Sequence, residues 1–474
     1  MRKDLLIYFI SLTVALVFVF LLSVACSPFY GMDSAVFDAG VFQTIGFQWS
    51  KGHLPYSELW DHKGPLIFLF NALGYSLMGT KTGIMLLEAF SISIFIYYSY
   101  KALRTNFNIR ASIIGAGITI LLLAGTYAGG DNVEEIILPL LSYCFYRTCQ
   151  WIAADKQKHV SYGLENSVLI GLLLAVGLLT RLTNVAAGGG ILLGVCILAT
   201  KEKYWKDVFM CIGGTIIGFI VLIMPFVMYF YSHGIISEAV QCILGFNGSY
   251  ATTTNDFPLV KYISHMISTA PCYFLLALSS ASVFCFKQKH SMLWLFATAL
   301  TMAWLLPSRM FLKYSIIGVP FFPILLIELA SIMKSMKWNK NVRFAFYALV
   351  ALIPLTTLRF IHSFKNEEIV ILTNHLEKDI DNNAKFIAYE TPTQVCLNLG
   401  VMPCYRFFYG QDNLSTVSLG YESEMLKEFE SCKAEWILMK AEQPRIEYIL
   451  NRHYYLFKEY EDLPGYKLYR RQER

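Results

Sequence analysis

Runs of about 20 apolar residues recur along the chain, and they constrain its fold more than any other feature. A helix of that length crosses the ~30 Å hydrocarbon core of a membrane, where only helices and closed barrels satisfy their backbone hydrogen bonds. Hydrophobic residues make up 55% of the 474 residues, and charged residues only 15%. That balance excludes an ordinary soluble globular chain. The sequence therefore predicts a polytopic α-helical membrane protein.

The pattern predicts about eleven spanning helices. They are expected at 5–27, 83–102, 110–128, 134–152, 164–180, 184–200, 207–232, 266–286, 291–306, 314–333 and 343–361. The first run follows Met1-Arg2-Lys3, and its alternative is a cleaved signal peptide ending near Val24-Ala25-Cys26. The run is longer than the apolar core of a usual signal peptide, which favours a membrane helix.

Basic residues are unevenly divided between alternate loops, which predicts the orientation. One set of loops carries Arg2/Lys3, Lys101/Arg104/Arg110, Arg147/Lys156/Lys158, Lys201/Lys203/Lys206, Lys287/Lys289 and Lys334/Lys337/Lys340/Arg343. The other set carries fewer, at Lys51, Lys63, Lys81, Arg181, Lys261, Arg309 and Lys313. Since loops rich in Lys and Arg stay in the cytoplasm, we expect a cytoplasmic N-terminus. A bacterial inner membrane is the expected location. The net charge of +5 is then a topology signal rather than a sign of nucleic-acid binding.

The composition changes after residue 362, where charges become frequent and apolar runs shorten. We therefore predict a transmembrane domain at 1–362 and a small extracytoplasmic α/β domain at 363–474. Strands are expected at 386–389, 436–439 and 466–469, and helices at 365–380, 422–432 and 444–452. Cys396 and Cys404 are candidates for a disulfide if this domain lies outside the cytoplasm.

The outer loop at 28–82 is expected to be structured. Residues 35–49 have a helix-like apolar spacing that suits a segment at the membrane interface, and 66–78 form an apolar piece too short to span. The loop gathers the carboxylates Asp33, Asp38, Glu58 and Asp61, the histidines His53 and His62, and the lysines Lys51 and Lys63. The other long outer loop, at 233–265, has the length of a lid or a disordered connector.

Four outward places hold polar residues of unusual type: Asp33 with 61–65, then 129–135, 180–184 and 307–314. A carboxylate can act as a general base on an acceptor, and Arg or Lys can hold a phosphate that leaves. Each place also has a purely structural interpretation. Asp33 can pair with Lys63 at a helix end, and acids at a helix start, such as Glu134 and Glu135, suit the helix dipole. Arg181 can snorkel to the interface, and Arg309 and Lys313 can bind lipid head groups.

These motifs resemble those of the GT-C superfamily of membrane glycosyltransferases. The motifs are Asp33-Ser34, Gly52-x-x-Pro55-Tyr56-x-x-x-Trp60-Asp61-x-Lys63-Gly64-Pro65-Leu66, Asn132-x-Glu134-Glu135-x-x-x-Pro139 and Arg309-x-Phe311-x-Lys313-Tyr314 with Pro320. The branch they resemble contains lipid A aminoarabinose transferases, protein O-mannosyltransferases and lipopolysaccharide galacturonosyltransferases. The resemblance covers about residues 1–330.

The resemblance implies transfer of a sugar, hexosyl or pentosyl, from a polyprenyl-phosphate donor to a lipid, glycan or protein acceptor. Asp33 matches the acidic residue that activates the acceptor or coordinates a divalent metal, and Lys63 matches the lysine that faces the donor phosphate. Glu134 matches the acid of the second loop, with Glu135 as the alternative register.

Three cations, Arg181, Arg309 and Lys313, are expected beside the donor phosphate, with Asp61, Tyr56 and Tyr314 as further site residues. The resemblance also implies a divalent cation, Mg or Mn, held by Asp33 and Glu134. Ser34 replaces the usual second acid of the first motif, and a missing carboxylate weakens a hard-cation site. One in-line displacement is expected to invert the anomeric centre.

Three other functions stay open. A transporter or flippase of lipid-linked sugars would place ionisable groups within helices along a midplane path, whereas Glu88 and Glu328 are the acids found away from the ends of the expected spans. A ligase or polymerase of surface polysaccharide would share the donor class and differ in the acceptor. In a non-catalytic relative, Asp33 and its partners would serve folding alone.

Overall fold

The computed structural model describes residues 2–31, 37–249, 290–305, 312–335, 337–351, 367–381, 384–417 and 419–472. The predicted span at 266–286 and two predicted site residues, Asp33 and Arg309, lie outside these ranges. The chain divides into two compact units. The first comprises Met1–Leu22, Leu86–Tyr229 and Thr254–Ser363, and the second comprises Ser23–Met85, Phe230–Thr253 and Phe364–Arg474. The predicted division into domains at 1–362 and 363–474 concerns which parts fold independently, and it stays a prediction.

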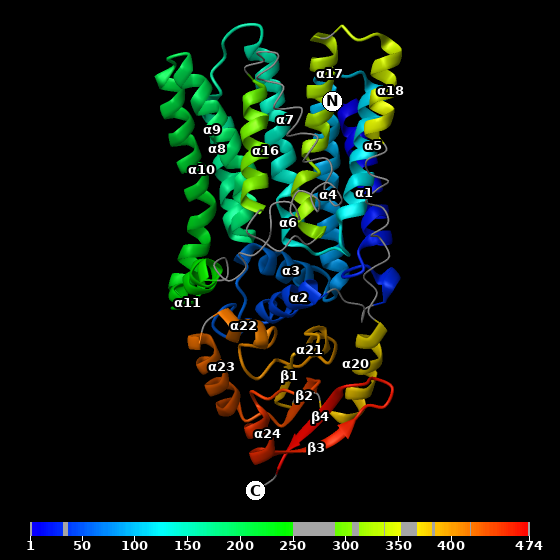
Figure 1. The fold of residues 1–474 in the computed structure, drawn as a ribbon, viewed down its shortest axis with the longest axis vertical. Helices are drawn as coiled ribbons and strands as arrows, with labels where there is room; N and C mark the ends of the chain where they lie inside the picture. Colours follow the sequence, from blue (N-terminus) through cyan, green and yellow to red (C-terminus); the bar gives the residue numbers. More distant parts are fainter. Residues whose placement is uncertain are drawn as a thin grey trace. The chain divides into compact units, whose positions relative to one another are not determined.

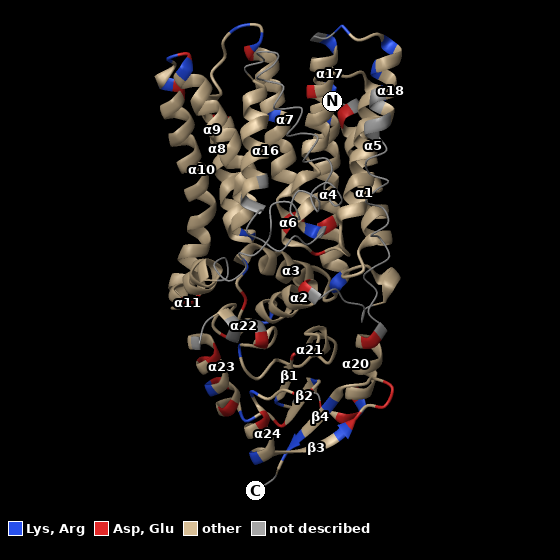
Figure 2. Ribbon diagram, in the orientation of Figure 1, with Lys and Arg blue, Asp and Glu red and all other residues tan. Residues whose placement is uncertain are grey.

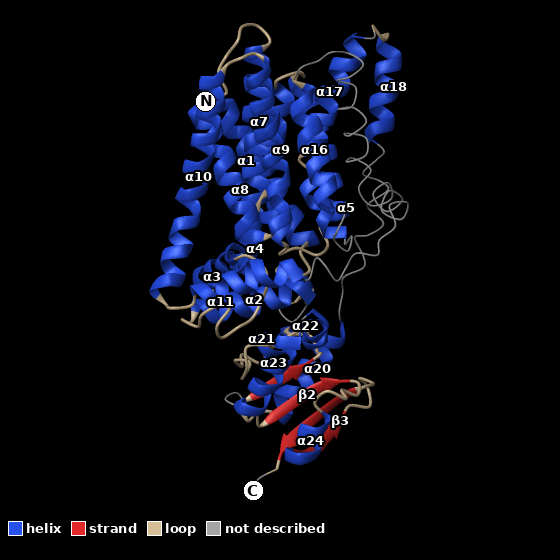
Figure 3. Cartoon of the chain, turned by 60° about the vertical axis from the view of Figure 1, so that its left-hand side comes forward, coloured by secondary structure: helices blue, strands red, loops and turns tan. Residues whose placement is uncertain are grey.

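The first unit is a bundle of apolar helices that run side by side (Figures 1 and 3). Its elements are α1 (Arg2–Leu22), most of α4 (Lys81–Arg104), α5 (Ile109–Thr126), α6 (Val133–Ile136), α7 (Leu138–Asp155), α8 (Gly163–Thr180), η2 (Leu182–Val185), α9 (Ala186–Lys201), most of α10 (Trp205–Ser232), α16 (Ser291–Leu305), η4 (Leu312–Gly318), α17 (Phe321–Ser335) and α18 (Lys340–Ala351). Among the described residues, six segments are long and apolar enough to span a membrane. They are Asp4–Leu22, Lys81–Arg104, Ile109–Thr126, Gly163–Thr180, Leu182–Lys201 and Trp205–Ser232. The chain is therefore a polytopic α-helical membrane protein.

Glycine lets neighbouring helices in this bundle approach closely. A Cβ atom at Gly190 of α9 would lie 2.3 Å from the Cα of Ala297 in α16, and one at Gly171 of α8 would lie 2.0 Å from the carbonyl oxygen of Thr215 in α10. Real Cβ atoms do not come that close, so these helices meet backbone to backbone. Apolar side chains gain little from pairing in lipid, and small residues at crossings replace that driving force.

Three expected spans begin differently in the structure. The span at 134–152 is divided at Ile137 into α6 and α7, and the span at 184–200 is preceded by the 3₁₀ turn η2. The span at 314–333 begins as the 3₁₀ helix η4, and α17 starts only at Phe321, after Pro320. Proline has no backbone N–H and disfavours a helical residue before it, which accounts for the late start of α17.

Lys and Arg gather at the end of the bundle where α7 joins α8, α9 joins α10 and α17 joins α18 (Figure 2). The basic residues of these loops are Lys156, Lys158, Lys201, Lys203, Lys206, Lys334, Lys337 and Lys340. The helix bodies between the two ends are mostly uncharged (Figure 2). Three of the loops predicted to be rich in Lys and Arg therefore lie at the same end of the bundle.

The second unit contains the two helices expected in the outer loop. They are α2 (Phe37–Ser50) and α3 (Pro65–Met78), and the latter is too short to span, as predicted. Gly46 of α2 packs against α3 so closely that an added Cβ would lie 2.3 Å from the Cβ of Asn71. Val41 and Ile45 are buried. The apolar face of α2 therefore packs against protein rather than standing exposed.

The tail, also in the second unit, forms a four-stranded sheet in the order β1-β2-β4-β3. Its strands are β1 (Phe386–Tyr389), β2 (Trp436–Lys440), β3 (Tyr454–Glu459) and β4 (Tyr466–Arg471); β1 and β2 are parallel, and the other pairs are antiparallel. Its helices are α20 (Glu367–Asp379), α21 (Gln394–Asn398), α22 (Gln411–Val417), α23 (Leu419–Cys432) and α24 (Glu447–His453). The expected α/β domain is present, and the edge strand β3 was missed because its exposed Tyr455, Leu456 and Phe457 do not alternate with polar residues.

The predicted partner of Cys404 was wrong. Cys404 forms a disulfide with Cys432, the last residue of α23, and their Cα atoms are 6.0 Å apart. Cys396 is a free thiol. It lies on α21 with its side chain fully buried in the hydrophobic core of the tail.

Candidate functional site

The loop between α2 and α3 places a buried carboxylate beside a lysine. Asp61 is 2% exposed, and its Oδ1 accepts a hydrogen bond of 2.7 Å from the backbone N–H of Lys63. Burial raises the pKa of Asp61 above its ordinary value, while the Lys63 cation and the hydrogen bonds from Lys63 and Tyr409 oppose that rise. The carboxylate of Asp38, on α2, adds a smaller upward effect on the same pKa. Asp61 is thus a buried carboxylate with polar neighbours.

Lys63 is held by its neighbours along the chain. Its Nζ lies 2.5 Å from Nε2 of His62, and its carbonyl oxygen accepts a 2.9 Å hydrogen bond from the hydroxyl of Tyr56. Gly64 and Pro65 then start α3, and proline at the first helical position leaves no backbone donor unused. Lys63 therefore lies directly before the start of α3.

Tyr56 is a buried residue of the same loop that supports Lys63. It is fully buried, its hydroxyl bonds Lys63, and its ring packs edge-on against Phe68 and Phe230 at centroid distances of 5.9 and 5.6 Å. Its backbone adopts φ +71°, a left-handed conformation that costs a side-chain-bearing residue energy. Strained residues of this kind persist where the surroundings fix them, and they cluster at functional sites.

A second buried carboxylate lies in the first unit, beside an arginine. Glu134 of α6 is fully buried, and its Oε1 lies 3.0 Å from Nη1 of Arg181. The guanidinium carbon of Arg181 lies 3.5 Å from the ring centroid of Tyr314 in η4. Arg181 is 13% exposed in its side chain, so snorkelling to the membrane surface does not describe it. Three residues predicted separately from the sequence are thus in contact.

One oxygen of this carboxylate is open. Glu134 Oε2 is buried and has no hydrogen-bond partner within the described ranges of the chain. Buried polar atoms are almost always paired, because an unpaired one forfeits the hydrogen bonds that water gave it. An oxygen in that state can receive a proton, a hydroxyl group or a cation.

The neighbouring acid, Glu135, accepts hydrogen bonds within its own loop. Its Oε1 accepts hydrogen bonds from the Asn132 side chain at 2.7 Å and from the Asn132 backbone N–H at 3.3 Å, which caps α6. Glu88 of α4 accepts the backbone N–H of Asp131 at 2.5 Å. The contacts of the two acids therefore differ. Glu134 contacts Arg181, whereas Glu135 caps α6 through Oε1, and its Oε2, like that of Glu134, has no hydrogen-bond partner among the described residues.

The loop before α6 is held in an unusual conformation. Four consecutive residues have positive φ: Ala128 (+54°), Gly129 (+88°), Gly130 (+88°) and Asp131 (+55°). Alanine and aspartate rarely adopt this region without support. The contact from Glu88 supplies that support at Asp131, which explains an acid inside an apolar helix that the sequence left unexplained.

The predicted site residues therefore fall into two clusters. Asp61, Lys63 and Tyr56 meet in the second unit, and Glu134, Arg181 and Tyr314 meet in the first. Lys313 lies partly buried on η4, directly before Tyr314. Sequence reasoning missed Tyr409, a tail residue with no motif to mark it. Among the residues that the structure covers, no group of three His, Cys, Asp or Glu side chains is placed to hold a metal ion.

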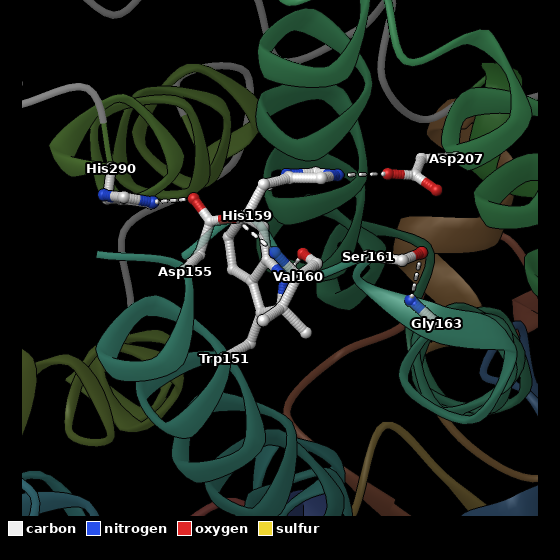
Figure 4. A network of polar contacts seen from close by, with 8 residues as sticks. All are labelled: Trp151, Asp155, His159, Val160, Ser161, Gly163, Asp207 and His290. Atoms are coloured by element: carbon white, nitrogen blue, oxygen red, sulfur yellow. Dashed lines mark hydrogen bonds and ion pairs between the residues drawn. The ribbon is translucent and has the colours of Figure 1, made fainter. Parts of the chain in front are cut away.

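The first unit also contains a His–Asp network that the sequence did not suggest, buried at Asp155 and His290 and exposed at His159 (Figure 4). Asp155, at the end of α7, lies 2.8 Å from Nε2 of His290 and 3.2 Å from Nδ1 of His159. Nε2 of His159 lies 3.2 Å from Asp207, in the first turn of α10. The Lys-rich loops adjoin this network, which ties α7 to the starts of α10 and α16.

Comparison with known proteins shows which families this chain is similar to. Residues 62–229 match the model of a family described as dolichyl-phosphate-mannose-protein mannosyltransferase. Together with the fold, this match confirms the resemblance to the GT-C superfamily of membrane glycosyltransferases. No curated protein matches the chain by sequence.

Among solved structures, the chain is similar to ArnT from Cupriavidus metallidurans. The structure of ArnT bound to undecaprenyl phosphate aligns with a TM-score of 0.63 and 12% sequence identity, covering 97% of each chain. The apo state of the same protein aligns with a TM-score of 0.62 and the same identity and coverage. An oligosaccharyltransferase from Archaeoglobus fulgidus aligns at 10% identity and a TM-score of 0.47, over 91% of this chain and 69% of its own. The likeness to ArnT extends over the tail as well as the membrane helices.

Proposed function

We propose that this protein is an integral-membrane glycosyltransferase that moves a sugar from a polyprenyl-phosphate donor to an acceptor outside the cytoplasm. The observation that carries the proposal is that each unit holds a buried carboxylate: Asp61, which accepts the backbone N–H of Lys63, and Glu134, which pairs with the Arg181 guanidinium. The superfamily fold adds to it, and the ArnT structure that this chain resembles holds undecaprenyl phosphate. About eleven spans and a bacterial inner membrane complete the proposal, with a cytoplasmic N-terminus that the loop charges support (Figure 2).

The chemistry needs a base and a site for the leaving phosphate. The acceptor oxygen attacks the anomeric carbon in line and gives its proton to a carboxylate, for which we propose Asp33. The bond from that carbon to the phosphate oxygen breaks, and the oxygen keeps the electron pair. Lys63, Arg181, Arg309 and Lys313 are the proposed cations that stabilise it. One such displacement inverts the anomeric centre and needs no nucleotide.

We propose one protein ligand for a divalent cation. The open oxygen of Glu134 is a hard ligand of the kind that Mg or Mn prefers. When bound, the cation would supply further positive charge to the leaving phosphate. Chelation with EDTA, followed by return of Mg or Mn, tests whether transfer depends on it.

The test compares lipid-linked sugars and surface glycolipids by mass spectrometry in a deletion strain and in complemented strains. Wild type is expected to restore one missing sugar and to remove the accumulated polyprenyl-phosphate donor. Asp33→Asn and Lys63→Met are expected to restore neither. Lys51→Met is the matched control, because Lys51 is an exposed lysine of the same loop that stacks on Phe47 at 3.9 Å.

A transporter or flippase of lipid-linked sugars is the alternative, and the same experiment separates it. It predicts that a lipid-linked sugar builds up on the inner face while the outer donor pool falls. That outcome, or full activity of Asp33→Asn, would contradict the transferase. The mass lost from the glycan would also identify the sugar and the acceptor.

A further inference from the structure

A short segment of the tail lies along the loop that carries Asp61 and Lys63. The segment is 404–409, Cys-Tyr-Arg-Phe-Phe-Tyr, and it belongs to the second unit with that loop. The backbone N–H of Trp60 donates a 2.9 Å hydrogen bond to the carbonyl oxygen of Arg406. Nη1 of Arg406 in turn donates to the carbonyl oxygen of Tyr56 at 3.5 Å. The two stretches are therefore joined through their backbones.

Trp60, directly before Asp61, is enclosed by aromatic rings and is 2% exposed. The ring centroids around it are those of Phe246 at 4.9 Å, His62 at 5.9 Å, Tyr409 at 5.9 Å, Phe407 at 6.2 Å and Tyr421 at 6.2 Å. Three of these five rings come from the tail. Aromatic pairs at such distances add stability beyond the area they bury. The position of Trp60, and of the carboxylate that follows it, therefore depends on the tail.

The tail also reaches the carboxylate itself: the Tyr409 ring lies 5.9 Å from that of Trp60, and the Tyr409 hydroxyl lowers the pKa of Asp61 as a neighbouring donor. A donor of this kind favours the ionised form of the acid. The other titratable groups that influence or adjoin Asp61 are Lys63 and His62 of its own loop, Asp38 of α2, Tyr56, and Cys242 of the π-helical turn η3 (Gln241–Phe246). Within this set, Tyr409 is the group that the tail provides.

The segment is itself fixed to α23. The disulfide joins Cys404 to Cys432, at the end of that helix. Arg406 forms ion pairs with Glu424 and Glu428 of the same helix, the second at 2.9 Å through Nε. Helix α23 therefore holds the segment through Cys404 and Arg406. The segment in turn contacts Trp60 and Asp61.

We propose that Tyr409 and Arg406 are positioning residues of the transfer site: Tyr409 orients the Asp61 carboxylate, and Arg406 holds the loop from Tyr56 to Lys63. The proposal rests on the function proposed above. In this proposal the tail positions residues of the site and does not merely cover them. The tail acts through Asp61 and Lys63 and need not touch the sugar.

The first test is Tyr409→Phe, which keeps the ring beside Trp60 and removes only the hydroxyl. Transfer is followed in native membranes of the deletion strain expressing each variant, as the initial loss of the endogenous polyprenyl-phosphate sugar at a series of pH values. Without the hydroxyl, ionised Asp61 loses a donor, so the acid limb of the pH–rate profile is expected to move to higher pH. On the acid side the rate falls by roughly tenfold or more, which is the value of one hydrogen bond to a charged group.

Tyr454→Phe is the matched control. Its hydroxyl is also buried in the tail, where it donates to the carbonyl oxygen of Ala434 at 2.9 Å, away from the site. The acid limb of this variant is expected to match wild type. A Tyr409→Phe profile that coincides with both would overturn the proposal, and so would equal displacement of the limb in the two variants.

The second test compares two tail arginines that form similar ion pairs. Arg406→Gln is expected to lower the rate while the variant still binds undecaprenyl phosphate in lipid nanodiscs. Arg445, which pairs with Asp412 and Glu422, provides the control Arg445→Gln. If both variants lose activity equally, the tail serves stability alone. If wild type itself transfers no sugar, the proposed function fails, and that result is distinct from either outcome.

Discussion

The two buried carboxylates are alike in burial and in having a cation nearby, yet their oxygens are used differently. Asp61 receives hydrogen bonds from the backbone of Lys63 and from Tyr409, and its neighbours come from three stretches of the second unit. Glu134 has one oxygen on Arg181 and one open oxygen. A well-partnered carboxylate is suited to holding other groups in place. A carboxylate with an open oxygen is suited to receiving one.

The largest effect is expected from removing the cation beside Glu134. Arg181→Met leaves a buried carboxylate without its partner, and breaking a buried pair in this way costs about 3–5 kcal/mol. Thermal unfolding in lipid nanodiscs measures the loss. Arg147→Met is the control, since Arg147 pairs with the exposed Glu165 at 2.7 Å, and exposed pairs contribute about 0–1 kcal/mol. Equal losses in the two variants would contradict the contrast between buried and exposed pairs.

The next effect concerns the support of Asp61. Cys432→Ser opens the disulfide, which closes a loop across a sequence separation of 28 residues. Such a loop contributes about 3–4 kcal/mol through the unfolded state. The Asp61 cluster depends on the tail, so proteolysis within 54–63 is expected to increase in this variant. If loop cleavage stays at the wild-type rate while the tail is destabilised, the two regions are not coupled.

The smallest effect is expected from neutralising Asp61. Because burial raises the pKa of Asp61, the charged form is disfavoured in the folded state. The stability associated with this group is therefore present below the ordinary aspartate pKa and is lost as the pH rises through the raised value. Asp61→Asn should remove this loss, so its Tm relative to wild type should rise with pH across that window. A flat difference would mean that Lys63 and Tyr409 fully offset the burial.

Sequence patterns predicted the helices better than the contacts between them. Apolar runs placed α4, α5 and α8 to within a few residues, because a span must be apolar over its whole length. The same patterns did not predict η4, where Pro320 delays the helix, or the partner of Cys404, which is chosen by the packing of the tail. Asp61 and Lys63 were identified because they are close in sequence. Tyr409 was missed because it meets Asp61 only in three dimensions.

The contact between Trp60 and Arg406 also has a consequence for synthesis. About 350 residues separate the loop from the segment that supports it, and ribosomes add roughly 5–20 residues per second. The loop is thus synthesised on the order of tens of seconds before the residues that complete its surroundings. Contacts of such long range form late in folding. A chain halted before residue 404 would carry the motif residues of the loop without the segment that holds them in place.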